Sequence, residues 1–258
     1  MRRAFLAAAM IAVIAPCIGA PIVLKRLSSI GDATSHSALA GIALGLVFGI
    51  NPILSAVIFS ILAVLGIEAL RKVFKFYGEI ATVVVMSAGI GLTAVLSGFI
   101  TNGSSNLNSF LFGSIVAISD FEMYLTIGLG IAVIAVSALL YKELFFVTFD
   151  EEAARLSGVP VGTINFIIMT LTAITVSVAS RVVGALMISS LLVIPVAAAM
   201  TIARSYKQTM VLSIIFAEIF TLAGLFISYY LDLRPGGTIV LLGVIFLIII
   251  MLVTKKKS

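Results

Sequence analysis

The chain has 258 residues, of which 62% are hydrophobic and 10% are charged, and its formal net charge is +5. Soluble domains carry about 25% charged residues, so this composition excludes a water-soluble fold and predicts an integral membrane protein. The single cysteine, Cys17, excludes an intramolecular disulfide. The basic residues are scattered between apolar segments, which is typical of membrane topology signals and not of nucleic-acid binding.

The apolar runs approach the roughly 20 residues that a spanning helix needs, and they lack the short alternating segments of an outer-membrane barrel. The first run follows Met1-Arg2-Arg3 like a signal peptide, but no convincing cleavage site and soluble body follow it. We predict an all-α, polytopic bundle of about eight or nine spans that forms a single domain over residues 1–258. Residues 163–203 are expected to form a tight helical hairpin or, as an alternative, one long bent element. The runs lie at about 4–24, 30–50, 52–70, 80–100, 121–141, 163–180, 182–203, 208–231 and 238–254.

Lysine and arginine orient the bundle, because they occupy alternate connections. The other connections contain only Arg181 and Arg234, and the polar stretch 101–120 contains neither residue type. The positive-inside rule makes the basic connections cytoplasmic. Nine spans then place Met1-Arg2-Arg3 outside, against the rule, so the sequence leaves the span count open. The cytoplasmic set comprises Lys25, Arg26, Arg71, Lys72, Lys75, Lys142, Arg155, Arg204, Lys207, Lys255, Lys256 and Lys257.

Asp32 and His36, the only histidine, are candidate metal ligands. Their spacing of four residues places a carboxylate and an imidazole on one helix face. Both suit zinc or manganese, and ionisable groups inside a membrane are costly to keep without a function. A simpler interpretation makes Asp32 a helix N-cap and His36 a satisfied core residue. Two ligands are too few for a metal, so others must come from further helices, a second copy or water.

The same span carries a ladder of small residues with a spacing of four, which lets another helix approach closely and hold the ligands in place. Glu218 is a second acid deep in an apolar segment, and it is a candidate for the ion path, a proton relay or a hydroxyl pair. The ladder consists of Ala33, Ser37, Gly41, Gly45 and Gly49.

The connection at about 150–160 predicts a short cytoplasmic helix, because acids open it and Gly158 and Pro160 end it. It is either a solvated surface helix or a handle for a cytoplasmic partner. The chain has no glycine-rich phosphate loop, and its one histidine lies in a span, so we expect transport and no enzymatic activity of its own.

At these residues the chain resembles the membrane subunit of ABC-type metal importers, the zinc/manganese permease family. The resemblance rests on the order and spacing of several stretches, spread over nearly the whole chain. They are Leu24-Lys25-Arg26, the Gly-Asp-x3-His-x-x-Leu-x-Gly pattern from Gly31 to Gly41, the Glu-Ala-Ala-x3-Gly pattern Glu152-Ala153-Ala154 to Gly158, and the segments 109–114 and 184–197.

The resemblance implies an ATP-driven importer in a bacterial cell membrane. Two copies would form the membrane core, two cytoplasmic ATPase subunits would dock on the 150–160 helix through Glu152, Ala153, Ala154 and Gly158, and an extracellular metal-binding protein would deliver the ion. Asp32 and His36 would coordinate the passing metal, with no permanently bound cofactor. The resemblance assigns no secure match to Glu218, whose role is inferred from its own position. The Leu-Pro ending of the usual ABC coupling sequence is absent.

The segments around Asn51-Pro52 and 111–116 resemble the zinc branch more than the manganese branch, so we favour zinc. Two alternatives remain open. In a proton-coupled secondary transporter, Asp32, His36 and Glu218 would form a proton relay. In a structural membrane protein, the polar pair would only specify helix packing.

Overall fold

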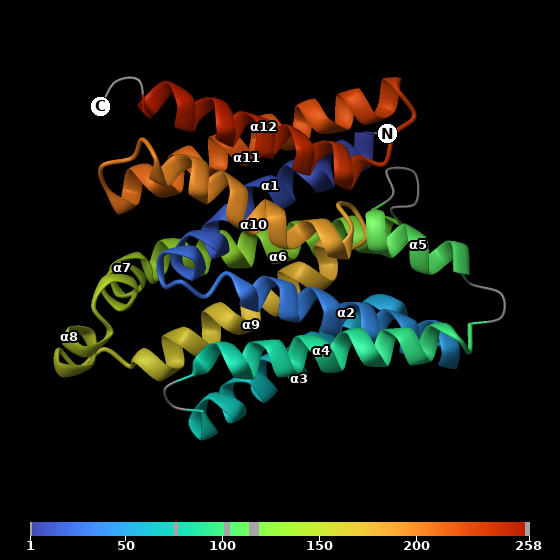
Figure 1. Cartoon of the computed structure of the whole chain (residues 1–258), viewed down its shortest axis with the longest axis horizontal. Coiled ribbons are helices and arrows are strands. Elements are labelled where there is room, and N and C mark those ends of the chain that lie inside the picture. Colours follow the sequence, from blue (N-terminus) through green and yellow to red (C-terminus); the bar gives the residue numbers. More distant parts are fainter. Residues whose placement is uncertain (1, 75–76, 101–103, 114–118, 256–258) are drawn as a thin grey trace.

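The computed structural model describes residues 2–74, 77–100, 104–113 and 119–255 (Figure 1). Met1, Lys75, Lys256 and Lys257, together with residues 114–116 of the resemblance, lie outside the described residues. The described ranges form helices and no strand, as predicted. The helices are α1 (Arg2–Leu24), α2 (Ser29–Phe48), α3 (Pro52–Val73), α4 (Gly78–Ser97), α5 (Ser104–Phe112), α6 (Asp120–Leu139), α7 (Tyr141–Phe149), α8 (Glu151–Leu156), α9 (Val161–Ala179), α10 (Ala185–Met200), α11 (Tyr206–Tyr230) and α12 (Pro235–Lys255).

Within the described part of the chain, 8 helices are long and apolar enough to cross a membrane: α1, α2, α3, α4, α6, α9, α11 and α12. α10 is apolar but shorter, with 16 residues. The contacts that flank α10 show whether its segment also crosses the bundle from one end to the other. Before it, Arg181 pairs with Glu122 at the start of α6 (3.3 Å). After it, Tyr206 packs against Tyr141, just past the end of α6. The segment containing α10 therefore runs the length of α6 and adds a crossing to the eight longer helices.

The two classes of connection gather at opposite ends of the bundle. We call the end that contains Arg3, Asp120 and Arg181 the basic-poor end, and the end that contains Lys25 and Arg155 the basic end. Arg3 forms an ion pair with Asp120 (2.7 Å), which places the start of α1 at the basic-poor end. In Figure 1 the N and C labels lie on opposite sides of the molecule. The N-terminal arginines thus lie on the side that opposes the positive-inside rule, and one of them is neutralised there by a carboxylate.

The segment 163–203 breaks as predicted, because α9 ends at Ala179 and α10 begins at Ala185. The two helices do not form a tight hairpin, since α10 packs mainly against α1, α11 and α12. The end of α5 packs against the turn between α9 and α10. A Cβ atom on Gly184 in this turn would lie 2.6 Å from the carbonyl carbon of Phe112, the last residue of α5.

Polar residues fix the helix starts that shape the basic-poor end. The Asn51 side chain accepts hydrogen bonds from the backbone N–H groups of Ile53 (3.0 Å) and Leu54 (3.3 Å), and Pro52 supplies the first residue of α3. At α6, Ser119 and Glu122 form a reciprocal capping box. The ends of α3 and α6 are thus defined by their own sequence.

Candidate functional site

Asp32 and His36 lie in the first two turns of α2, as the sequence predicts. The helix begins at Ser29, and Ser28 occupies the N-cap position. Asp32 is the fourth residue of the helix and not its cap, so the interpretation of this carboxylate as a capping group is wrong. Its position on the helix face beside His36 needs another explanation.

The pair lies partway along its neighbouring helices and not at an end of the bundle. Between the two residues, the carbonyl oxygen of Thr34 accepts a hydrogen bond from Ser60 Oγ (3.3 Å), in the first half of α3. On the other side, Gly89 near the middle of α4 packs directly against the backbone of His36 and Ser37. The start of α2 is therefore inserted into the bundle between α3 and α4.

The ladder of small residues on α2 serves this insertion. A Cβ atom on Gly41 would lie 2.5 Å from the carbonyl oxygen of Ser55, and one on Gly45 would lie 2.9 Å from the Cα of Pro52. Both glycines therefore allow α3 to lie against α2, as predicted. Gly49 has a different role, because it ends α2 in the left-handed conformation (φ 67°).

Asp32 is exposed on an otherwise buried stretch of α2. The residues from Ile30 to Gly45 are buried apart from Asp32, the half-buried His36 and the half-buried Leu44. An ionisable side chain that leaves the protein interior within a membrane must face a water-filled path or another protein surface. In the part of the chain that the structure describes, no group of three His, Cys, Asp or Glu side chains could hold a metal ion. The described residues of one copy therefore supply an open, incomplete ligand set.

Glu218 lies on α11, half-buried and far along the chain from the pair. α11 packs mainly against α1, α10 and α12, whereas α2 packs mainly against α3, α4, α9 and α10. Helix packing does not bring Glu218 together with Asp32. Its role in the ion path stays a prediction.

The predicted short helix at 150–160 is present as α8, which protrudes beside α7 in Figure 1. Asp150 caps it by accepting a hydrogen bond from the N–H of Ala153 (2.9 Å). Ala154 is fully buried among apolar side chains of α7 and α9 and anchors the helix. Glu152 and Gly158 are exposed, and Gly158 has φ +84°, which an L-residue rarely adopts. One face of α8 is thus fastened to the bundle and the other is free to meet a partner.

A polar cluster beside α8 was missed by the sequence analysis, which used Lys25 only as a topology signal. Lys25 Nζ donates to Asn165 Oδ1 (2.6 Å) and lies 3.5 Å from the Glu151 carboxylate. Asn165 Nδ2 also donates to Glu151 Oε1 (3.0 Å). Burial lowers the pKa of Lys25, and the charge of Glu151 opposes this shift. No motif marks this cluster, since its members are distant in the sequence.

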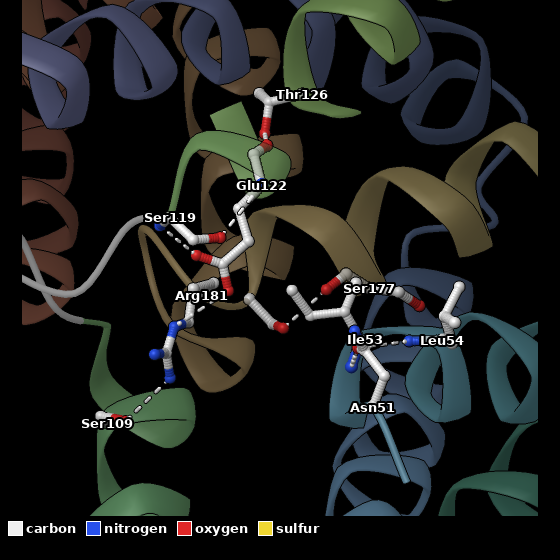
Figure 2. A network of polar contacts seen from close by, with 10 residues as sticks. Asn51, Ile53, Leu54, Ser109, Ser119, Glu122, Thr126, Ser177 and Arg181 are labelled. Atoms are coloured by element: carbon white, nitrogen blue, oxygen red, sulfur yellow. Dashed lines mark hydrogen bonds and ion pairs between the residues drawn. The ribbon is translucent and has the colours of Figure 1, made fainter. Parts of the chain in front are cut away.

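At the basic-poor end, α3, α5 and α6 surround an open pocket of about 250 Å³. Figure 2 shows Glu122 pointing toward Arg181, whose guanidinium also reaches Ser109 Oγ (3.4 Å). The Arg181 guanidinium lies 4.5 Å from the centre of the Phe110 ring. Glu122 is thus engaged by a cation and by the capping box. The pocket is lined by Leu46, Asn51, Pro52, Ile53, Phe110, Ser119, Phe121, Glu122 and Arg181.

Known proteins resemble the chain over its whole length. A "probable metal transport system membrane protein" of Treponema pallidum is 34% identical over 257 residues, covering 99% of this chain and 96% of that protein. The manganese import system permease protein ScaB of Streptococcus parasanguinis is 32% identical, covering 100% and 91%. The high-affinity zinc uptake system membrane protein ZnuB of Haemophilus influenzae is 29% identical, covering 98% and 97%.

Among solved structures, the fold resembles a chain of PsaBC from Streptococcus pneumoniae in complex with Fab. The TM-score is 0.86 at 30% identity, and the match covers 96% of this chain and 90% of that chain. An inward-facing putative metal-chelate type ABC transporter shares the fold at 14% identity and a TM-score of 0.73, covering 96% and 84%. The model of the ABC 3 transport family matches residues 1–254. The resemblance drawn from the sequence is therefore confirmed, and this multi-span protein of the cell membrane belongs to the ABC 3 transport family.

Proposed function

We propose that the chain is the membrane subunit of an ATP-driven importer that moves a divalent transition metal ion across the cell membrane, and that Asp32 and His36 coordinate the ion in transit. The observation that carries the proposal is the exposed carboxylate and half-buried imidazole on one face of a helix inserted between α3 and α4. Membership of the ABC 3 transport family supports the class of transporter.

The open ligand set fits a transported ion better than a resident one. A structural zinc site closes four protein ligands around the metal, and such a site would not release its ion. In a single copy of the chain the Asp32 side chain is exposed, so the remaining ligands come from water or from a second copy. We propose a homodimeric core on this ground, with Asp32 facing the path between the copies.

The ion is Zn²⁺ or Mn²⁺. A carboxylate and an imidazole bind both, because sites of this kind select by geometry and metal availability. The relatives include a manganese permease at 32% identity and a zinc permease at 29%. The preference for zinc drawn from the sequence stays a prediction, and the experiment below compares the two ions directly.

Energy comes from separate partners in this proposal. The exposed side of α8, with Glu152 and Gly158, is the docking point for a cytoplasmic ABC ATPase, while the buried Ala154 fastens it to α7 and α9. Ala153 donates the capping hydrogen bond to Asp150 that begins this helix. At the opposite end of the bundle, an extracellular metal-binding protein delivers the ion. A proton-coupled secondary transporter is the weaker alternative, since it needs no ATPase dock.

The test uses the full chain, reconstituted in lipid vesicles with its ATPase subunit, and measures uptake of Zn²⁺ and Mn²⁺ with and without ATP. Asp32→Asn and His36→Gln should each lower ATP-dependent uptake at least about tenfold, the loss that even outer-shell substitutions cause at metal sites. Asp120→Asn, an exposed carboxylate at the basic-poor end, is the matched control and should keep full uptake. Full uptake by either site variant refutes the ligand assignment, and uptake driven by a proton gradient without ATP refutes the importer class.

A further inference from the structure

The start of α2 is joined to the end of α1 by a rigid elbow. Leu27 N donates to Ile22 O (2.9 Å) and Arg26 N donates to Val23 O (3.0 Å), while Arg26 adopts φ 58°. These two bonds around a left-handed residue form a Schellman motif, which closes a helix in a fixed geometry. The bonds continue into α2, since Ile30 N donates to Leu27 O (3.0 Å). A displacement of Lys25 is therefore carried into α2 and is not absorbed by a loose loop.

Lys25 stands at this elbow and touches the base of α8. Its ammonium lies 3.5 Å from the carboxylate of Glu151, the first residue of α8, and 2.6 Å from Asn165 Oδ1 on α9. Asn165 closes the triangle by donating to Glu151 (3.0 Å). The Lys25 side chain is only 10% exposed, whereas that of Glu151 is 43% exposed. Three helices are thus joined through one nearly buried cation.

We infer that Lys25 is a positioning residue that couples α8 to the metal-bearing helix: when α8 moves, Glu151 pulls Lys25, and the elbow moves α2 and with it Asp32 and His36. This inference rests on the proposed function, since it assumes that an ATPase acts on α8. It assigns a specific path from the docking helix to the ion, seven residues along the chain from Lys25 to Asp32.

The position of Glu151 in α8 distinguishes a coupling contact from one that only stabilises the fold. Glu151 is the first residue of α8 and lies beside the cap Asp150, so the carboxylate cannot stay in place when the helix tilts. Other attachments of this region are apolar: the Tyr206 ring packs against Phe145 and Phe149 of α7, which holds α7 to α11. Within the described part of the chain, the side-chain polar contacts that Glu151 makes with Lys25 and Asn165 reach beyond α8 and its cap. Coupling through Glu151 therefore gives α8 a direct link to α2.

The test measures transport and ATP hydrolysis separately in the reconstituted complex, with Zn²⁺ and Mn²⁺ as the transported ions. Lys25→Met keeps the unbranched apolar stem of the side chain and removes the charged ammonium. It should lower the number of ions moved per ATP about tenfold, a normal size for a coupling between two sites. ATP hydrolysis should stay near the wild-type rate, because no group of the ATPase is changed. Lys207→Met, an exposed lysine at the same end of the bundle, is the matched control and should change neither rate.

Two further variants separate coupling from simple stability. Lys25→Arg preserves the charge and should recover most of the transport. The exchange Lys25→Glu with Glu151→Lys restores an ion pair in the reverse sense and should recover more transport than either single change. A loss of transport and hydrolysis in equal proportion, or no loss at all, overturns the inference. If Lys25→Met does not fold, Glu151→Gln provides the same test, because it removes the charge of the other member of the pair and keeps the size of its side chain.

These outcomes are distinct from a failure of the proposed function. A wild-type complex that moves neither ion with ATP contradicts the importer itself. If the wild-type complex transports normally and the Lys25→Met variant moves the same number of ions per ATP, only the role of Lys25 is contradicted.

Discussion

Ser177 Oγ donates a hydrogen bond to Ser60 Oγ (2.8 Å), and Ser60 in turn donates to the carbonyl oxygen of Thr34 (3.3 Å). These bonds join α9 and α3 to the turn of α2 that lies between Asp32 and His36. Both serines are fully buried. Hydrogen bonds between membrane helices cannot be exchanged for bonds to water. The two hydrogen bonds therefore fix the position of the metal-bearing turn of α2 relative to α3 and α9.

Ser60→Ala and Ser177→Ala should each destabilise the protein, and their effects should not add, because both remove the same bond. Double-mutant cycles between membrane helices give about 0.6 kcal/mol on average, which sets the expected coupling. The measurement is reversible unfolding of the two single variants and the double variant in mixed micelles. Ser97→Ala is the control, since Ser97 is exposed and bonds only within its own helix. Additive effects of the two changes would show that the serines act independently.

Gly89→Ala should lower both stability and metal uptake. The added Cβ would lie 2.9 Å from the carbonyl carbon of His36, so α4 must move away from the metal-bearing turn. Overpacking of this kind costs about 1–3 kcal/mol. Gly91→Ala in the same helix is the matched control, because nothing lies within 4 Å of its added Cβ. Thermal unfolding and the uptake rate of the two variants check the prediction, and equal behaviour would contradict it.

The sequence predicted what depends on residues close together in the chain. The spacing of Asp32 and His36 gave their shared face, and the acids and glycine around 150–160 gave α8. It could not predict that Gly89 meets the backbone of His36, or that Lys25 meets Asn165, because those contacts depend on how helices distant in the sequence pack. The interpretation of Asp32 as a cap failed for a local reason, because Ser28, four residues before Asp32, already holds the N-cap position.

Glu122→Gln should destabilise the basic-poor end without removing the cap of α6. Glutamine can still accept a hydrogen bond from the N–H of Ser119, as the carboxylate does at 2.7 Å, but it no longer compensates the charge of Arg181. The Glu122 side chain is 13% exposed and that of Arg181 is 19% exposed, so we expect the free energy of unfolding to fall by about 1–3 kcal/mol.

Unfolding of the Glu122→Gln variant measured at low and high salt checks this prediction, since a buried ion pair is screened little by salt. Glu79→Gln, an exposed acid in the first turn of α4, is the control. A loss that disappears in high salt would mean that the pair is solvated.

Gly158→Ala should impair ATP-driven uptake through backbone strain alone. The position is open, with nothing within 4 Å of an added Cβ, but its φ of +84° costs an alanine about 1–2 kcal/mol. The chain leaving α8 would relax toward an ordinary conformation and tilt the docking surface. Gly162→Ala is the matched control, because that position is equally open and has no positive φ. Gly158→Asn should recover part of the uptake, since asparagine tolerates the left-handed region better than alanine. If alanine at 158 and alanine at 162 leave the same uptake per ATP hydrolysed, the conformation of Gly158 does not contribute to coupling.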